Sequence, residues 1–242
     1  MLDAIPKTAG SSTDIEIAVN GLQAWYGESH VLHDIGFDVK KGEVVTLLGR
    51  NGAGKTTTLR ALMGLVNRRD GSAVICGEQT IKYPSRRIAR LGIGYVPEER
   101  GIFSELSVEE NLMLPPKLRD GGFSREEIFD LFPNLKSRLH SQGTKLSGGE
   151  QQMLAMARVL RTGADCLFLD EPTEGLAPVI VQQIERVLQM LKARGFTIIL
   201  VEQNLRFAAS LADRHYVVEQ GRIVAQASGA DGIDSLTRYL GV

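Results

Sequence analysis

Apolar residues are grouped along the chain into short runs that predict buried strands. Residues 15–19 alternate between apolar and polar side chains, as half-buried strands do, and residues 31–39 form a second extended segment. Other runs are nearly continuous in apolar residues and are bounded by glycine, proline or charged turns. They cover residues 43–48, 72–76, 92–96, 166–170 and 196–201, and a closing hairpin is expected within residues 216–224.

Apolar residues at helical spacing fill most of the intervals between these strands. The clearest case follows Pro178, which suits a first helical turn, and its apolar side chains recur from Val181 to Leu191. A capping box formed by Ser124 and Glu127 opens another helix. Further helices are expected at residues 57–63, 85–91, 107–114, 126–131 and 153–160 and near residues 236–240.

A glycine-rich loop joins the strand at residues 43–48 to the helix at residues 57–63, and it fits the phosphate-binding pattern G-x-x-x-x-G-K-[ST]. The glycines let successive N–H groups face one anion at the positive end of the helix dipole. Lys55 supplies a charge for the outer phosphates, and the Thr56 hydroxyl suits Mg²⁺. ATP and Mg²⁺ are therefore the expected ligands. The nucleotide-binding residues predicted here are Gly49, Arg50, Asn51, Gly52, Ala53, Gly54, Lys55, Thr56 and Thr57.

Acidic and amide residues follow three of the apolar strands. Asp170 suits a Mg²⁺ ligand, and Glu171 suits polarisation of the water that attacks the γ-phosphate. Glu98 is a candidate for the metal or the attacking water, because the carboxyl ends of strands in an α/β sheet face the ligand crevice. Gln203 is placed to sense the γ-phosphate. Two acids after a strand also occur in helix caps and turns, but the phosphate loop upstream favours catalysis by Glu171, Gln203 and Glu98.

Two further features suggest contacts with a nucleotide. Ser147, Gly148 and Gly149 stand at the start of a helix and form a second anion-binding end, separate from the phosphate loop. Tyr26 precedes the phosphate loop, where an aromatic ring either stacks on adenine or packs in the core. The residues alone leave that choice open.

These elements predict an α/β fold. Its expected parts are a phosphate-loop NTPase core sheet flanked by helices, an N-terminal antiparallel β region and an inserted helical subdomain at about residues 102–146, where no strand is evident. Residues 1–14 are polar and are expected to form a flexible tail. Residues 15–242 then form one nucleotide-binding domain.

Charge and hydropathy narrow the class of protein. The formal net charge is −1, from 28 basic and 29 acidic residues, which gives no general attraction for nucleic acid. No run of about 18 apolar residues is present, so no membrane span is expected. The expected location is therefore the cytoplasm, or the inner face of the membrane through a partner.

The phosphate loop, the sequence LSGGEQQ from Leu146 and an apolar strand ending in Asp170-Glu171 together resemble the nucleotide-binding domain of ATP-binding-cassette (ABC) proteins. The resemblance covers residues 15–242. It implies that two such domains face head to tail, and that Ser147, Gly148 and Gly149 serve ATP bound by the partner. Tyr26 matches the aromatic residue that stacks on adenine. The helical subdomain would hold a short helix of a membrane subunit, so that ATP-driven closure moves the transport path.

Three residues depart from the general family pattern. Glu98 stands where glutamine usually contacts Mg²⁺ and water, Gln203 where histidine usually contacts the γ-phosphate, and Ala177 where aspartate usually follows the acid pair. Glu98 adds negative charge near the phosphates. Gln203 is expected to donate one hydrogen bond without becoming cationic. These changes bear on the rate and symmetry of hydrolysis.

Several stretches, including Val96-Pro97-Glu98 and Val201-Glu202-Gln203-Asn204, look like the shorter ATPase subunit of branched-chain amino acid importers. The resemblance implies a second ATPase subunit, or self-pairing in vitro, with two membrane permeases and, indirectly, a periplasmic solute-binding protein. No nucleic acid partner is expected. Relatives in this branch import urea or short amides, which is the alternative substrate class. An exporter ATPase and a soluble cassette protein acting on DNA or ribosomes are the remaining alternatives.

Overall fold

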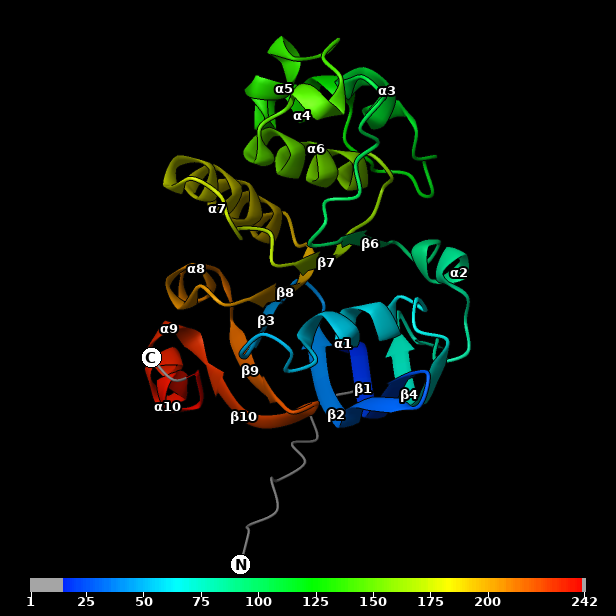
Figure 1. Ribbon diagram of the computed structural model, residues 1–242, viewed down its shortest axis with the longest axis vertical. Coiled ribbons are helices and arrows are strands. Elements are labelled where there is room, and N and C mark those ends of the chain that lie inside the picture. Colours follow the sequence, from blue (N-terminus) through cyan, green and yellow to red (C-terminus); the bar gives the residue numbers. More distant parts are fainter. Residues whose placement is uncertain (1–14, 241–242) are drawn as a thin grey trace, which may run out of the picture.

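The computed structural model describes residues 15–240, so the tail predicted at residues 1–14 and residues 241–242 lie outside the described residues. A six-stranded sheet forms the centre of the chain, in the order β10-β9-β3-β8-β7-β6 (Figure 1). All neighbours in it are parallel except β9 and β10. Its strands are β3 (Val44–Leu48), β6 (Ile93–Val96), β7 (Cys166–Asp170), β8 (Thr197–Glu202), β9 (Arg214–Glu219) and β10 (Arg222–Ser228).

The central strands are apolar throughout because both faces of the sheet are covered. In β8, Ile198 and Leu200 enter the core on one face of the sheet, which also contains buried residues from the segment between β6 and β7. Ile199 and Val201 enter the core on the opposite face. A half-buried strand would instead have alternated between polar and apolar residues.

A second sheet covers one face of the first. It is antiparallel, in the order β2-β1-β4-β5. Its strands are β1 (Ile15–Tyr26), β2 (Ser29–Lys40), β4 (Arg68–Ile75) and β5 (Glu78–Gln79). Tyr26 ends β1, which is longer than the predicted 15–19, and β5 was not predicted. The predicted N-terminal antiparallel region is thus present, and its apolar residues share a core with α1 (Lys55–Leu62).

Helices between β6 and β7 form the upper part of the molecule in Figure 1. They are α3 (Val108–Met113), α4 (Arg125–Leu131), α5 (Pro133–Ser137), the 3-10 helix η1 (Gly143–Lys145) and α6 (Gly148–Leu160). Capping boxes open α3, α4 and α6, because a serine accepts from the backbone of a glutamate that bonds back to the serine's N–H. The boundary of a helical subdomain at 102–146 stays a prediction.

The remaining helices flank the sheet domain. They are α2 (Ser85–Ala89), α7 (Pro178–Ala193), α8 (Leu205–Leu211), α9 (Gly229–Gly232), the 3-10 helix η2 (Ile233–Leu236) and α10 (Thr237–Leu240). The apolar stripe of α7 is buried at Ile184, Val187, Leu188 and Leu191, whereas Val181 is only partly covered. Within residues 15–240, no helix is both long and apolar enough to cross a lipid bilayer.

Candidate active site

The phosphate-binding loop lies between β3 and α1. Gly49, Gly52 and Gly54 have φ values of 153°, 78° and 109°, which favour glycine over residues with a Cβ. Lys55 folds back over the loop, since its Nζ donates to the carbonyl oxygens of Gly49 at 2.9 Å and Arg50 at 3.2 Å. Only 3% of Lys55 is exposed. The ammonium group is therefore held inside the loop.

The hairpin between β9 and β10 supports this loop from behind. The N–H of Gly221 donates to the Ala53 carbonyl at 2.8 Å, and the Gly221 carbonyl accepts from the N–H of His33 in β2 at 2.8 Å. A Cβ on Gly221 would lie 2.0 Å from the Val31 carbonyl oxygen. Gly221 therefore lets one turn connect the phosphate-binding loop to the antiparallel sheet.

Asp170 ends β7 and is completely buried. Thr56 donates its hydroxyl to Asp170 Oδ1 at 2.9 Å, and Tyr95 donates its hydroxyl to Oδ2 at 3.0 Å. Burial raises the pKa of Asp170, while both hydroxyls act in the opposite direction by bonding the ionised form. The two donors fix the orientation of the carboxylate, and Tyr95 was not identified from the sequence.

Glu171 lies next to the ammonium group of the loop. Its Oε1 forms a 3.1 Å ion pair with Lys55 Nζ, and its Oε2 accepts from Gln203 Nε2 at 2.6 Å. The backbone φ of Glu171 is +47°, an uncommon conformation for a residue other than glycine, and its N–H bonds to the Val201 carbonyl at 3.0 Å. Such strained positions persist where surrounding contacts determine them, and they occur often at functional sites.

Gln203 makes more contacts than expected. Its Nε2 also donates to Asn51 Oδ1 at 2.7 Å, so it joins the phosphate-binding loop to Glu171. Both hydrogens of the amide NH₂ are donated to protein groups, and the contact of Gln203 with the γ-phosphate stays a prediction. Gln203 thus bridges two residues with one uncharged group.

A buried carboxylate, missed in the sequence, organises the loops that carry Glu171 and Gln203. Glu202 is 3% exposed and accepts from the Thr173 hydroxyl at 2.7 Å and from the Thr173 N–H at 3.3 Å. It also accepts from the N–H groups of Gln203 at 3.1 Å and Asn204 at 3.2 Å. The loop after β7 and the loop after β8 are therefore tied to one side chain.

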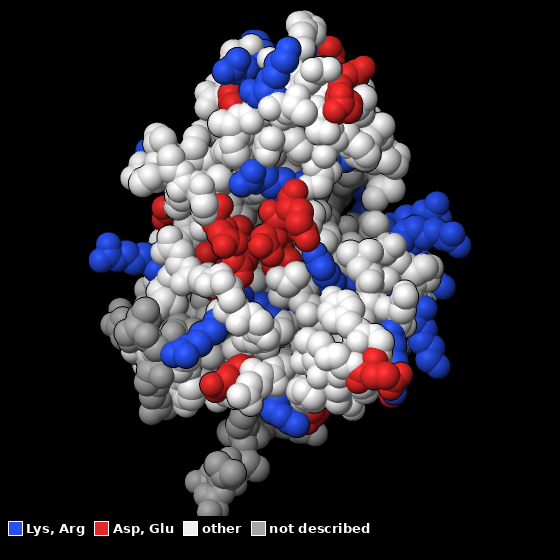
Figure 2. All heavy atoms as spheres, viewed as in Figure 1, with Lys and Arg blue, Asp and Glu red and all other residues white. Residues whose placement is uncertain are grey.

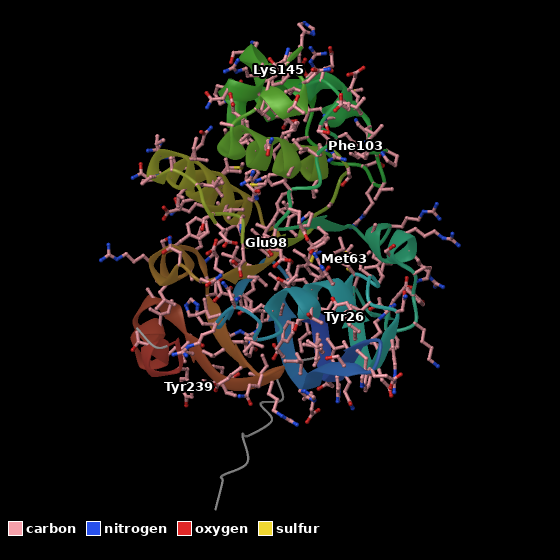
Figure 3. All side chains as sticks on the ribbon, viewed as in Figure 1. Tyr26, Met63, Glu98, Phe103, Lys145 and Tyr239 are labelled. Atoms are coloured by element: carbon pink, nitrogen blue, oxygen red, sulfur yellow. The ribbon has the colours of Figure 1, made fainter. Side chains whose placement is uncertain are left out.

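Two exposed acids lie close to Asp170 and Glu171. Glu98 and Glu174 are exposed, and the charge of Glu98 acts on both Asp170 and Glu174. A hydrogen bond with Glu171 is the main cause of the raised pKa of Glu174. Figure 3 places Glu98 between the helical part and the sheets, and Figure 2 shows acidic side chains gathered in the same central region.

The oxygen groups of this site fit Mg²⁺. The Thr56 hydroxyl and the Asp170 carboxylate are hard ligands held 2.9 Å apart, and Glu98 brings a further carboxylate nearby. Residues 15–240 contain no cluster of three or more acidic, histidine or cysteine side chains able to hold a metal ion unaided. Mg²⁺ is commonly bound through one or two carboxylates together with phosphates and water, so Thr56 and Asp170 are suitable ligands without a larger cluster.

The second predicted anion-binding end begins α6. Ser147 caps this helix by accepting from the Glu150 N–H at 3.3 Å, and Glu150 accepts from the Ser147 N–H at 2.8 Å. Ser147 is exposed, while Gly149 is buried against Ile180. Among the described residues, no hydrogen bond or ion pair joins Ser147, Gly148 or Gly149 to the phosphate-binding loop, so the chain forms two separate regions.

Tyr26 ends β1 on the same side of the molecule as α1 (Figure 3). Its ring is 46% exposed, so core packing does not account for its position. The preceding residue, Trp25, is half-buried, since His30 stacks on it at 4.4 Å and Arg68 lies 4.7 Å from its ring centre. Stacking of Tyr26 on adenine remains a prediction.

Comparisons with known proteins agree with this architecture. Residues 32–174 match the ABC transporter family profile. The chain is 44% identical to the high-affinity branched-chain amino acid transport ATP-binding protein BraG of Pseudomonas aeruginosa, over 88% of this chain and 93% of BraG. It is 37% identical to the probable branched-chain amino acid transport ATP-binding protein LivF of Archaeoglobus fulgidus, over 84% and 87%. A nucleotide-free ATP-binding cassette from an ABC transporter superposes with a TM-score of 0.80 at 23% identity, over 93% and 95%.

The six-stranded sheet has the fold of a solved ATP-binding cassette. The family match and the 44% identity to an ATP-binding protein define the class as a nucleotide-binding cassette. The chain belongs to the ABC transporter family. The predicted fold and the predicted type of enzyme, an ATP-hydrolysing cassette, are therefore confirmed.

Proposed function

We propose that this chain is the ATPase subunit that energises an ABC importer of branched-chain amino acids. The observation that carries the proposal is the joining of Lys55, Glu171 and Gln203 by direct contacts at the carboxyl edge of the parallel strands. The substrate class follows from the 44% identity to BraG, whose name assigns it to branched-chain amino acid transport.

ATP hydrolysis at this site requires charge stabilisation and an oriented water. Lys55 and the loop N–H groups bind the phosphates, where negative charge develops during transfer. Glu171 orients and polarises the attacking water. Gln203 aligns Glu171, and its Nε2 would exchange the hydrogen bond to Asn51 for one to the γ-phosphate. Thr56 and Asp170, with Glu98 nearby, would hold Mg²⁺, which would neutralise negative charge on the phosphates. ATP binding would require Lys55 to exchange part of its contact with Glu171 for phosphate oxygens.

The sequence Leu146 to Glu150, called here the signature region, would act on ATP bound by a second nucleotide-binding chain. Ser147, Gly148 and Gly149 begin α6 in the helical part, whereas the phosphate-binding loop lies in the sheet domain (Figure 1). Two chains arranged head to tail bring each signature to the ATP of the other chain. The partner is a homologous ATPase subunit, or a second copy of this chain in vitro. Tyr26 then stacks on the adenine of the ATP that is bound by Lys55 of the same chain.

An exposed apolar region offers a site for a membrane permease helix. Phe103, Met113 and Leu114 are exposed, and Phe103 contacts Arg158, which lines a cavity of about 180 Å³ together with Pro97 and Pro115. Figure 3 shows Phe103 on the side of the helical part that faces α2 and Met63. One permease subunit docked at this region of each chain, two in all, would hold the pair of ATPase chains at the inner face of the membrane. A periplasmic solute-binding protein would act through them.

The solute never contacts the ATPase in this arrangement, so the alternative of a urea or short-amide importer uses the same chemistry. The importer hypothesis predicts that solute uptake depends on Lys55, whereas the hypothesis of a soluble cassette protein does not. The test measures uptake of labelled leucine, isoleucine, valine and urea in cells lacking the native gene and carrying either this chain or Lys55→Ala.

Loss of uptake of the three branched amino acids in the Lys55→Ala cells, with urea uptake unchanged, is the expected result. Loss of urea uptake alone would overturn the substrate class while leaving the ATPase mechanism intact. Unchanged uptake of all four solutes, with the variant present at normal levels, would contradict an importer role.

A further inference from the structure

Arg100 occupies a strained position beside the signature region. It follows β6 by four residues, and its φ is +65°, a left-handed conformation that residues other than glycine rarely adopt. Its N–H bonds to the Pro97 carbonyl at 2.9 Å, which closes a turn. This turn directs an arginine from the segment after Glu98 towards the start of α6.

The guanidinium of Arg100 lies against the backbone of Gly148. A Cβ on Gly148 would be 3.2 Å from Arg100 Nη1 and 3.2 Å from Nη2, so the absence of a side chain at Gly148 makes room for it. Arg100 Nη1 donates to Gln151 Oε1 at 3.0 Å, and Gln151 Nε2 donates to the Gly143 carbonyl at 3.1 Å. The group is therefore fixed by a neutral amide on the first turn of α6.

The positive charge of Arg100 has no carboxylate partner within 4.0 Å among residues 15–240. The nearby acid of the capping box, Glu150, pairs instead with Arg138 at 3.2 Å. A guanidinium carries five N–H donors, and the contact with Gln151 uses only one. Planar donors of this kind suit phosphate oxygens better than a lysine does. Arg100 is thus equipped to bind an anion next to Ser147.

We propose that Arg100 binds the γ-phosphate of ATP held by the opposing chain, together with Ser147 and the backbone of Gly148. This inference rests on the proposed head-to-tail pairing of two nucleotide-binding chains. Arg100 would then serve the partner's ATP, while Glu98, two residues earlier, serves the ATP of its own chain. One short segment would contact both nucleotides of the dimer.

Arg100 also lines the cavity of about 180 Å³ assigned above to a permease helix. A role limited to that docking would leave ATP-driven pairing of isolated chains unaffected. Pairing of isolated chains therefore separates the two roles without a membrane partner.

The experiment measures mixed dimers by energy transfer between donor-labelled and acceptor-labelled chains, each carrying Glu171→Gln so that ATP is retained. In the separated pair, the donor chain carries Lys55→Ala and the acceptor chain carries Arg100→Gln. In the combined pair, the donor chain carries both changes and the acceptor chain has neither. The reference pair has Lys55→Ala in the donor chain alone.

The separated pair is expected to dimerise with ATP at the same chain concentration as the reference pair, because both defects fall on one composite site. The combined pair is expected to need about tenfold more chain, the effect of one lost charge-assisted hydrogen bond. If the separated pair needed more chain than the combined pair, Arg100 would be assigned to the nucleotide of its own chain. Equal concentrations for all three pairs would assign it no nucleotide contact. Either result would overturn the proposal.

Two controls keep the outcome specific. Arg100→Lys keeps a charge and should recover part of the tenfold loss. Arg158→Lys alters another arginine that joins α6 to the segment after β6, because the Arg158 guanidinium donates to the Gly101 carbonyl. This change should leave the chain concentration needed for dimerisation unchanged. An equal increase for Arg158→Lys would mean that a loosened contact between α6 and this segment, and not a lost phosphate contact, weakens pairing. Failure of the parent Glu171→Gln chains to pair with ATP would refute the proposed function itself, a result distinct from normal pairing that ignores Arg100.

Discussion

At the residue scale, the orientation of Asp170 depends on two hydroxyl groups, one from the phosphate-binding loop and one from β6. Tyr95→Phe removes the donor to Oδ2 and leaves Thr56 in place. We expect the affinity for ATP in the presence of Mg²⁺ to fall about three- to tenfold, since one net hydrogen bond contributes about 0.5–1.5 kcal/mol. Affinity measured in EDTA should stay unchanged, because the carboxylate acts on the metal.

Tyr83→Phe is the matched control for this change. The Tyr83 hydroxyl donates to Glu78 at 2.9 Å, away from the phosphate-binding loop. The control should bind ATP normally under both conditions. An equal loss for Tyr95→Phe with and without Mg²⁺ would show that Tyr95 supports the loop rather than the metal ligand.

A second residue-scale prediction concerns a buried histidine behind the site. His215 Nδ1 lies 2.6 Å from Thr46 Oγ1, and burial lowers the pKa of His215 below its usual 6.5. The folded chain therefore favours neutral His215, so this contribution to stability is complete above pH 6.5 and is lost as the pH falls through the lowered value. His215→Asn should show a smaller decrease in the free energy of unfolding between pH 7.5 and pH 5.5 than the parent chain.

Urea unfolding at the two pH values measures this difference. His140→Asn is the control, because the His140 side chain is 86% exposed and gains little from folding. An identical decrease for the parent and His215→Asn would exclude His215 as a source of acid sensitivity.

At the element scale, the β9–β10 hairpin determines how firmly the phosphate-binding loop is supported. Gly221→Ala would place a Cβ 2.0 Å from the Val31 carbonyl, so the turn must move away from Ala53 and His33. We expect a loss of about 2–4 kcal/mol in unfolding free energy, from overpacking and left-handed strain together. ATP affinity should also fall.

Gly195→Ala separates strain from displacement of the loop. Gly195 has a φ of +84°, similar to the +72° of Gly221, but no atom lies within 4 Å of its added Cβ. This control should lose only about 1–2 kcal/mol and bind ATP normally. Equal ATP affinities for the two variants would show that the hairpin does not support the loop.

Elements with a local sequence signal were predicted well. The phosphate-binding loop, the capping box at Ser124 and the apolar stripe of α7 each depend on residues close in sequence. The two-residue strand β5 was missed because it is too short to show a period. The helices α5 and α8 were missed because neither has the capping box that opens α3 and α4. β1 continues to Tyr26 because β2 and β4 pair with it there, which the sequence of β1 alone does not show.

In the candidate site too, residues with a local sequence signal were predicted, whereas residues placed by contacts distant in sequence were missed. Asp170, Glu171 and Gln203 were identified because they stand at the end of an apolar strand or directly after one. Tyr95 contacts a residue 75 positions away, and Glu202 contacts one 29 positions away. Neither contact follows from spacing, since each depends on which strands are neighbours in the sheet. The signal that the sequence offered for Glu202 was an acidic residue directly after the apolar run of β8.

At the scale of the whole molecule, the strand order brings four segments distant in sequence to one edge of the sheet. β3 leads into Lys55, β7 ends at Asp170, β8 ends at Glu202 and β6 leads towards Glu98. Ser147, Gly148 and Gly149 lie apart from this edge, at the start of α6 (Figure 1). In the proposed head-to-tail pair, each chain contributes one half to each of two composite sites. We therefore expect that ATP itself brings two chains together.

The most direct measurement of that central claim compares the parent chain with Glu171→Gln by ATP hydrolysis and by size-exclusion chromatography with multi-angle light scattering. The parent should hydrolyse ATP. The variant should retain ATP and elute as a dimer with ATP but as a monomer with ADP, with turnover reduced about a hundredfold or more, because polarisation of the attacking water is lost. Normal turnover by Glu171→Gln, or a variant that stays monomeric while saturated with ATP, would contradict the account.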